Sequence, residues 1–244
     1  MKLRYDLHIH SALSPCGDAD MTPNNIVNMA SICELDIIAV SDHNTCGNVE
    51  AVVRAGKQVG ITVVPAMELE TAEEIHVLCL FPSVETVCLF EQEIVVPALP
   101  DIKNNREIFG EQLLMDEQDR IVGEDDRYLI NATSVSLDGL AELVRQYGGV
   151  AVPAHIDKAT KSLVGNFGMV GEYMGFKTFE LSRNHDESFV AATPGLGKRP
   201  YRYIYDSDAH YLQDIGETSG ENIIDLEENS AESLIKLLNN EFSS

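Results

Sequence analysis

Most histidines in this sequence stand beside an acidic residue. Six of the seven fall where a predicted strand ends or close to such a point. Imidazole and carboxylate side chains together suit Zn, Mn or Fe ions. The sequence therefore predicts a metal cluster at one end of a parallel α/β barrel, the end where barrel enzymes place their active sites. The motifs are Asp6-Leu7-His8-Ile9-His10, Asp42-His43, Glu74-Ile75-His76, His155-Ile156-Asp157 and Asp208-Ala209-His210.

The pair His8 and His10 supports this prediction by its spacing. Residues two apart on a strand project from the same face, so both imidazoles can reach one ion while Leu7 and Ile9 face the packing. One such pair is weak support, because a single histidine is more often a hydrogen-bonded polar residue than a ligand. Ligand-type residues at the ends of several strands are much stronger support.

The elements that must position these residues follow from hydrophobic patterning. Strands are expected at residues 3–10, 36–40, 61–66, 76–81, 150–152, 177–181 and 203–205. Helices are predicted from Thr22-Pro23 to Cys33, over residues 48–59 ending at Gly60, and behind Ser136 ending at Gly148. This alternation is typical of a parallel α/β sheet or barrel.

Residues 83–134 interrupt the alternation. They contain Pro97, Pro100, an acidic middle and a potential hairpin of residues 112–116 against 120–124. We interpret them as an inserted subregion after the fourth strand, within a single domain that spans residues 1–244. Such an insertion either shapes access to the site or is a solvated elaboration without a role in catalysis.

Composition limits the location and the partners of the protein. The chain is 44% hydrophobic, has a formal net charge of -23 and contains five cysteines without a CxxC motif. With no signal peptide and no apolar segment of about 20 residues, we expect a soluble, cytoplasmic protein with reduced thiols and no membrane partner. The negative charge opposes binding of long nucleic acid, so nuclease activity on a polymer is disfavoured, whereas a small anionic substrate drawn in by metal ions is compatible.

The motifs match a known family in order and in spacing. Together with Ser41-Asp42-His43-Asn44, Glu68 and Ala154-His155, they resemble the PHP (polymerase and histidinol phosphatase) family of metal-dependent phosphoesterases. The resemblance covers nearly the whole chain outside the insertion. It implies a distorted (β/α)7 barrel with two or three divalent ions that hydrolyses phosphate esters.

The resemblance also implies a ligand set for each ion. The first ion would be held by four residues, His8, His10, Glu68 and Asp208. Glu68 would bridge to a second ion, which His76 and His155 complete. A third ion would take His43, His210 and one residue from the loop after the first strand.

That loop residue departs from the pattern of the family. Family members have a His or Asp about five residues past the second histidine, where this chain has Pro15. Alignment backward from Thr22-Pro23 favours Asp18 as the ligand, with Asp20 second and Cys16 third.

The expected mechanism follows from the ions. Two cations about 3.5 to 4 Å apart can share a hydroxide and stabilise both the attacking and the leaving oxygen. Glu68 and Asp208 would act by holding the ions, and Asp6 and Asp42 by orienting histidines through their ring nitrogens. For the substrate phosphate we expect Arg183, whose planar fork suits two oxygens, ahead of Lys158.

Three functions remain open to sequence reasoning. The leading one is a phosphoesterase that hydrolyses a small phosphorylated metabolite, of nucleotide or sugar phosphate type, by a metal-activated hydroxide. The alternatives are a metal-dependent amide hydrolase of a related barrel and a non-catalytic metal-binding regulator. Retention of nearly every ligand position disfavours the regulator.

Overall fold

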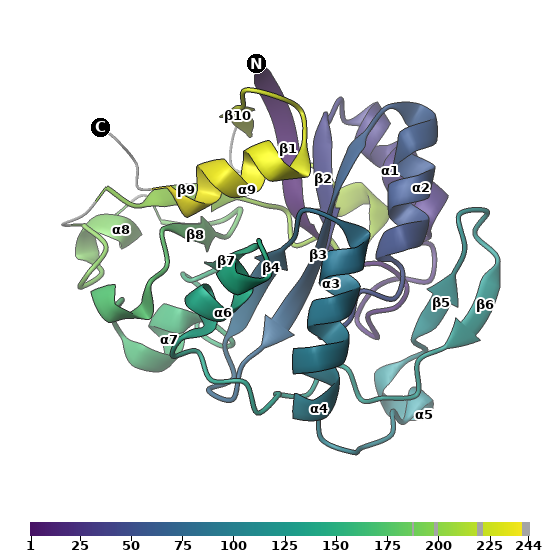
Figure 1. Ribbon diagram of the computed structural model, residues 1–244, viewed down its shortest axis with the longest axis horizontal. Helices are drawn as coiled ribbons and strands as arrows, with labels where there is room; N and C mark the ends of the chain where they lie inside the picture. The colour runs from purple at the N-terminus through teal and green to yellow at the C-terminus, as the bar shows by residue number, and fades with distance from the viewer. Residues whose placement is uncertain (187, 198–199, 219–221, 241–244) are drawn as a thin grey trace.

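A curled six-stranded sheet forms the centre of the molecule (Figure 1). The computed structural model describes residues 1–186, 188–197, 200–218 and 222–240. β1 pairs in parallel with β2, and β2 with β3, as the sequence predicts. The strands across the sheet are β10 (Ile223–Asp225), β1 (Lys2–Ile9), β2 (Ile37–Val40), β3 (Thr62–Glu70), β4 (His76–Leu80) and β7 (Val150–Pro153).

Two helices cover the outer side of β1, β2 and β3. α1 (Pro23–Ile32) begins at Thr22, whose side chain accepts from the N–H of Asn25, and has proline in its first turn. α2 (Val49–Val59) ends at Gly60, which has a φ of 81° that favours glycine. Their apolar faces share one core cluster with the outward side chains of the three strands. Both predicted helices are therefore present.

β4 runs against its neighbours, which differs from the parallel alternation predicted from the sequence. It pairs antiparallel with β3, where Glu70 lies opposite His76, and antiparallel with β7. Residues 71–75 between β3 and β4 are too few for a parallel connection, which needs about a dozen or more. The reversal brings His76, the first residue of β4, to the edge where β3 ends.

The six-stranded sheet is a curled half-barrel, because β8 (Thr178–Leu181) and β9 (Arg202–Tyr205) are not part of it. They form a separate parallel pair. Across the described ranges no strand ladder joins this pair to the larger sheet, although an isolated bridge links Ile9 to Ala209. α9 (Ala231–Asn239) packs over the edge where β1 begins, in a cluster with Leu3 (Figure 1).

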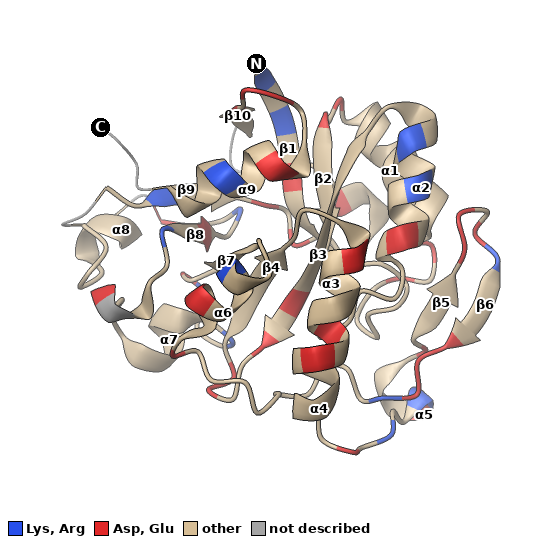
Figure 2. Cartoon of the chain, in the orientation of Figure 1, with Lys and Arg blue, Asp and Glu red and all other residues tan. Residues whose placement is uncertain are grey.

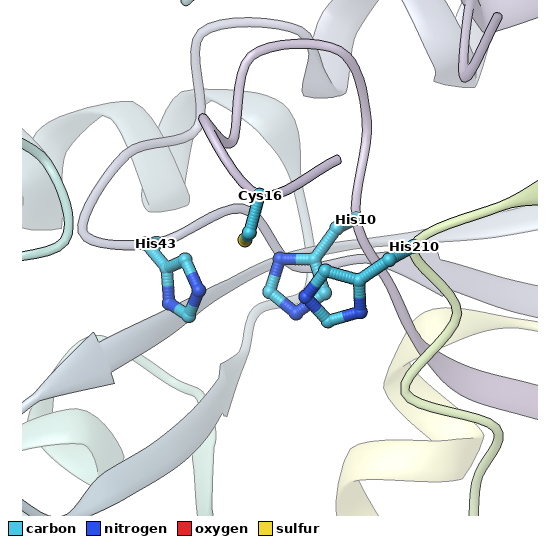
Figure 3. A group of neighbouring side chains, drawn as sticks. All are labelled: His10, Cys16, His43 and His210. Atoms are coloured by element: carbon cyan, nitrogen blue, oxygen red, sulfur yellow. The ribbon is translucent and has the colours of Figure 1, made fainter. Parts of the chain in front are cut away.

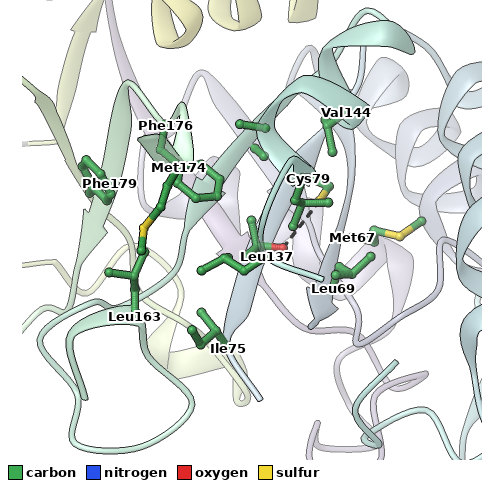
Figure 4. Close-up of a cluster of buried hydrophobic side chains, with 14 of the residues drawn as sticks. Met67, Leu69, Ile75, Cys79, Leu137, Val144, Leu163, Met174, Phe176 and Phe179 are labelled. Carbon is green, nitrogen blue, oxygen red and sulfur yellow. Dashed lines mark hydrogen bonds between the residues drawn. The ribbon is translucent and has the colours of Figure 1, made fainter. Parts of the chain in front are cut away.

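The region at 83–134 starts as a core helix rather than as a surface elaboration. Ser83 caps it by accepting from the N–H of Thr86 at 3.3 Å. Phe90 packs against Phe81 in the main core, part of which Figure 4 shows around Met67 and Phe176. The helical stretch comprises α3 (Val84–Phe90), the π-helical turn η1 (Glu91–Val95) and α4 (Val96–Ala98).

The second part of that region carries the predicted hairpin, formed by β5 (Leu113–Met115) and β6 (Ile121–Glu124). The N–H of Leu113 donates to the carbonyl of Ala12 at 2.9 Å, which ties the hairpin to the loop after β1. None of the described helices is long and apolar enough to cross a membrane. The other short helices are α5 (Arg106–Phe109), α6 (Leu140–Gln146), α7 (Leu163–Phe167), η2 (Glu172–Met174), α8 (Phe189–Ala192) and η3 (Leu212–Asp214).

Candidate metal centre

The buried carboxylate of Glu68 is the centre of the site. Glu68 lies near the end of β3 with a relative exposure of 1%. Histidine nitrogens from four different segments surround both of its oxygens. The distances to Oε1 are 3.3 Å from His8 Nε2, 3.0 Å from His76 Nδ1 and 3.3 Å from His155 Nε2, and those to Oε2 are 3.0 Å from His43 Nδ1 and 3.5 Å from His10 Nε2.

This arrangement fits metal ions better than a network of hydrogen bonds. Both oxygens of Glu68 and Nδ1 of His43 are buried and, among the residues that the structure describes, have no hydrogen-bond partner despite these short separations. Nε2 of His8 also lies 3.2 Å from Nε2 of His10, so two nitrogens face each other. Buried polar atoms normally find partners, and converging imidazole and carboxylate donors without them are what a shared cation needs.

Asp208 joins the same centre from the segment after β9. Its Oδ1 lies 3.3 Å from Nε2 of both His8 and His10, and its Oδ2 accepts from Lys158 Nζ at 2.5 Å. Asp208 has a φ of 52° and His155 a φ of 30°. Positive φ values outside glycine are uncommon and cluster at functional sites, where the surrounding structure enforces them.

Two carboxylates that the sequence reasoning missed orient the histidines. Glu180 Oε2 accepts from Nδ1 of His8 at 2.9 Å, which leaves Nε2 to face Glu68. Glu70 Oε2 lies 3.4 Å from Nε2 of His76 in the same way. The available signal was position, because Glu180 is the last but one residue of a predicted strand and Glu70 follows Glu68 by two residues on one strand face.

Asp42 was predicted to hydrogen-bond a histidine directly, but Ser14 lies between it and His10. Ser14 Oγ donates to Asp42 Oδ1 at 2.7 Å and lies 3.0 Å from Nδ1 of His10. Asp6 contacts no imidazole ring. It instead accepts from the backbone N–H groups of Ser207 at 3.1 Å and Gly216 at 2.9 Å, so it holds the segment that carries Asp208.

The loop residue beside His43 and His210 is Cys16, where the sequence reasoning favoured Asp18. Ligand atoms of His10, Cys16, His43 and His210 lie within 4.8 Å of one another (Figure 3). The side chain of Asp18 is engaged elsewhere, since its Oδ1 accepts from the N–H of Asp20 at 2.9 Å. Partial burial would raise the pKa of the Cys16 thiol, but hydrogen bonds with His210 and His43 lower it to about 6.

Mutual attraction sets the charges of the centre. Burial would raise the pKa of Glu68, yet the imidazoles of His76, His8 and His43 hold it well below its usual range. Burial would lower the pKa of His8, but Glu180, Asp208 and Glu68 raise it well above its usual value. In contrast, burial and the neighbouring His210 keep the pKa of His10 well below its usual value.

Two cavities open onto the centre and share Lys158 and Asp208 in their walls. One, of about 370 Å³, is lined by Glu68, Lys161 and Ile130 among others. The other, of about 580 Å³, extends past Lys158 toward Glu180 and Arg183. The chain has 40 Asp and Glu against 17 Lys and Arg, which Figure 2 shows along the backbone. Lys158 and Lys161 line the smaller cavity, and Lys158 and Arg183 line the larger one.

Arg183 lies at the far wall of the larger cavity and is already paired. Its NH1 is 2.9 Å from Glu217 Oε2 and 3.5 Å from Asp214 Oδ1. Lys158 is closer to the centre, because its ammonium contacts Asp208 directly. Lys161, which the sequence reasoning did not single out, contacts Glu70 at 2.5 Å and completes a basic pair on the loop after β7.

The site and the fold together define a family. The chain belongs to the PHP domain family, whose model matches residues 6–144. The match includes Glu68 and the histidines His8, His10, His43 and His76. His155, Asp208 and His210, which complete the site, follow the matched residues in the chain.

Known proteins resemble the chain over different extents. A 5'-3' exoribonuclease of Haemophilus influenzae (strain ATCC 51907 / DSM 11121 / KW20 / Rd) is 32% identical over 83 residues, which is 33% of this chain and 29% of the relative. The lesion-specific endonuclease PfuEndoQ from Pyrococcus furiosus shares the fold, with a TM-score of 0.63, 16% identity and coverage of 98% of this chain and 56% of its own. A putative metal-dependent phosphoesterase from Bifidobacterium adolescentis matches with a TM-score of 0.58, 19% identity and coverage of 84% and 87%.

These structures correct the prediction that no long nucleic acid is bound. Endonuclease Q has the same fold, with a TM-score of 0.58 and 17% identity over 87% of this chain and 50% of its own. Its structure is a complex with a 27-mer duplex substrate that has an abasic lesion at the active site. A fold of this kind therefore accepts a long duplex. Net charge is a poor guide here, because metal ions held by such a site would supply local positive charge.

Proposed function

We propose that this protein is a metal-dependent phosphoesterase whose catalytic ions are held around Glu68. The observation that carries the proposal is the carboxylate itself, buried at 1% exposure with histidine nitrogens on both oxygens and no hydrogen bond to either. A structural carboxylate in such a position would be hydrogen-bonded. Bound divalent ions would supply a water of lowered pKa and would polarise the phosphoryl oxygens.

The ligands divide into sets around two carboxylates. Glu68 and Asp208 both approach Nε2 of His8 and of His10, which supports these four as the first set. Oε1 of Glu68 also faces His76 and His155, which supports a second set bridged by Glu68. His43 and His210 belong to a third set. Two ions bridged in this way suit transition metals such as Zn, Mn or Fe.

The chain's own groups prepare the histidines and the substrate. Glu180 and Glu70 accept from the outer nitrogens of His8 and His76, so the inner nitrogens are free to bind. Lys158, beside Asp208 at the junction of the two cavities, is positioned to contact non-bridging phosphoryl oxygens. We propose a distorted seven-stranded barrel, over a single domain, as the framework.

The substrate proposed is a phosphate ester with a small organic group, of nucleotide or sugar phosphate type. Cavities of about 370 and 580 Å³ fall in the range of ligand sites, which is about 300 to 1,000 Å³. Ile130 gives the smaller one an apolar wall, and its neighbours Leu129 and Asn131 are held by Asn44 at 2.7 and 3.0 Å. A nucleotide at a chain end is a second candidate, favoured by the partial likeness to an exoribonuclease.

A panel of esters tests the proposal. The metal-loaded protein is incubated with sugar phosphates, nucleotides, 5'-phosphorylated oligonucleotides, an abasic duplex and a matched set of amides, and products are quantified. We expect hydrolysis of at least one phosphate ester that is lost in Glu68→Gln and retained in Glu85→Gln, which changes an exposed carboxylate on α3. Hydrolysis of amides alone, or ester hydrolysis that survives in Glu68→Gln, would contradict it.

A further inference from the structure

The loop after β1 presents a sulfur atom to the metal centre. Figure 3 shows Sγ of Cys16 directed toward the imidazoles of His43, His10 and His210. His10 is fully buried and His43 is 7% exposed, so these two nitrogen donors are fixed by the core. Cys16 itself is an exposed residue, open to solvent at the mouth of the smaller cavity.

The backbone of this loop holds Cys16 in place and turns Asp18 away. The N–H of Gly17 donates to the carbonyl of Ser14 at 2.8 Å, and the N–H of Asp18 donates to the carbonyl of His210 at 2.9 Å. A Cβ at Gly17 would lie 2.4 Å from the carbonyl oxygen of Ser11, so this tight approach requires glycine. The tether to His210 fixes the thiol beside that imidazole.

We propose that Cys16 is a thiolate ligand of the outermost metal ion, together with His43 and His210. The proposal rests on the metal centre described above and names the chemical identity of its third position. Cys16 differs from an isolated surface thiol, because its group of four includes two buried imidazoles. That of His10 is fully buried and that of His43 is nearly so. A cation that binds there replaces the thiol proton, which is released to solvent.

A sulfur donor changes which metal this position accepts. Thiolate with imidazole selects Zn(II), Co(II) or Fe(II), whereas carboxylate and water suit Mn(II). The Glu68 and Asp208 side offers carboxylates and remains tolerant of Mn. The protein therefore holds two kinds of metal position within one centre, and the outer one is selective for a softer ion.

Cobalt substitution tests the sulfur directly, without reference to catalysis. The chain is loaded with Co(II), and the sulfur-to-cobalt charge-transfer absorption in the near ultraviolet is followed together with cobalt content. We expect the band in the wild type and its loss in Cys16→Ser, with cobalt falling from about three to about two per chain. Asp18→Ala and the remote Cys33→Ser should keep both the band and the stoichiometry.

Two further measurements do not depend on whether Cys16→Ser folds. One replaces the sulfur donor with a carboxylate, and the other examines the wild type. Cys16→Asp should restore the third ion without the band and should bind Mn(II) there more tightly than the wild type does. In the wild type, X-ray absorption at the Zn edge should show one sulfur neighbour at about 2.3 Å. Metal should also protect Cys16 from alkylation by iodoacetamide, because a coordinated thiolate is a poorer nucleophile.

The outcomes separate this proposal from the proposed function. Absence of sulfur from the metal shell, a band that persists in Cys16→Ser, or loss of the third ion in Asp18→Ala would each overturn the thiolate ligand. Phosphate ester hydrolysis would then still stand. Conversely, a sulfur-ligated ion in a protein that hydrolyses no phosphate ester would retain the ligand and refute the function.

Discussion

The metal centre has two halves that are built differently. The inner half, around Glu68, is made by side chains of β1, β3 and β4 and of residues that follow β1, β7 and β9, and both His8 and His10 have no exposed surface. The outer half, around Cys16, is made by loops, and 26% of the His210 side chain is exposed. Strand ladders fix His8, Glu68 and His76 of the inner half, whereas isolated bridges and loop hydrogen bonds, including the one from Asp18 N–H to the carbonyl of His210, hold the outer donors.

This difference teaches where the centre can tolerate change. A strand fixes the direction of alternate side chains, so a ligand on it keeps its geometry through neighbouring substitutions. A loop ligand depends on its own turn, so the outer donor can differ between relatives without loss of the fold. The inner half should therefore control whether the protein functions, and the outer half which ion it prefers.

The strongest test of the inner half is Glu68→Gln. The amide has one oxygen acceptor instead of a charged bridge, so we expect loss of about one metal equivalent or more per chain and of nearly all activity. Elemental analysis and turnover on the best ester measure both. Full metal content with near-normal turnover would show that Glu68 does not bridge. Glu85→Gln provides the matched control, because its carboxylate is exposed on α3.

Glu180→Ala should weaken the inner half while sparing the outer one. Loss of the acceptor on Nδ1 of His8 frees the ring, and removal of such a partner typically costs about 10- to 100-fold in metal affinity. Competition with a chelator gives the affinity, and the cobalt–sulfur band reports on the outer ion. The same change at Glu142, which pairs with Arg145 on the surface of α6, should alter neither. An unchanged inner affinity would remove Glu180 from the centre.

Lys158 and Arg183 extend the comparison to substrate contacts. A charge-assisted contact from Lys158 to phosphate is worth roughly 1.5 to 3 kcal/mol, so Lys158→Ala should lower kcat/KM by about ten- to a hundredfold. Arg183→Ala should lower kcat/KM by less than about threefold, because its guanidinium is already paired with Glu217 and Asp214 and is not available to the phosphate. Lys57→Ala on α2 is the control. The reverse order of effects would move the phosphate to the Arg183 side of the larger cavity.

The pH dependence of stability should distinguish the metal-free protein from the loaded one. In the metal-free chain the pKa values of His8, His43, His76 and His210 are raised above their usual value. Their contribution is fully present below the unfolded pKa of about 6.5 and is lost as pH rises through the higher folded values.

Metal binding opposes this loss, because ligand imidazoles must release their protons first. The increase in Tm on metal addition should therefore grow as pH rises through that window. Thermal unfolding of chelated and loaded samples at a series of pH values measures the difference. A metal-induced increase that shrinks with rising pH would contradict the raised pKa values.

The sequence predicted His8 and His10 as a pair on one strand face because the signal for them is local. Spacing of two on a strand placed His8 and His10 on one face, and Gly60 and Thr22 marked helix ends that the structure contains. The family followed from the motifs and is confirmed by the match over residues 6–144. These features depend only on neighbouring residues and on backbone geometry, which a sequence displays directly.

Other features depended on contacts between distant segments. The choice of Cys16 over Asp18 follows from the bond of Asp18 to His210, which is 192 positions away along the chain. The partnership of Glu180 with His8 spans 172 positions, and no local pattern indicates it. The sequence alone determined which residue types could bind metal and on which strand faces they lie. Only the tertiary structure decided which of them meet, because loop turns and buried pairs take their geometry from the packing of the whole chain.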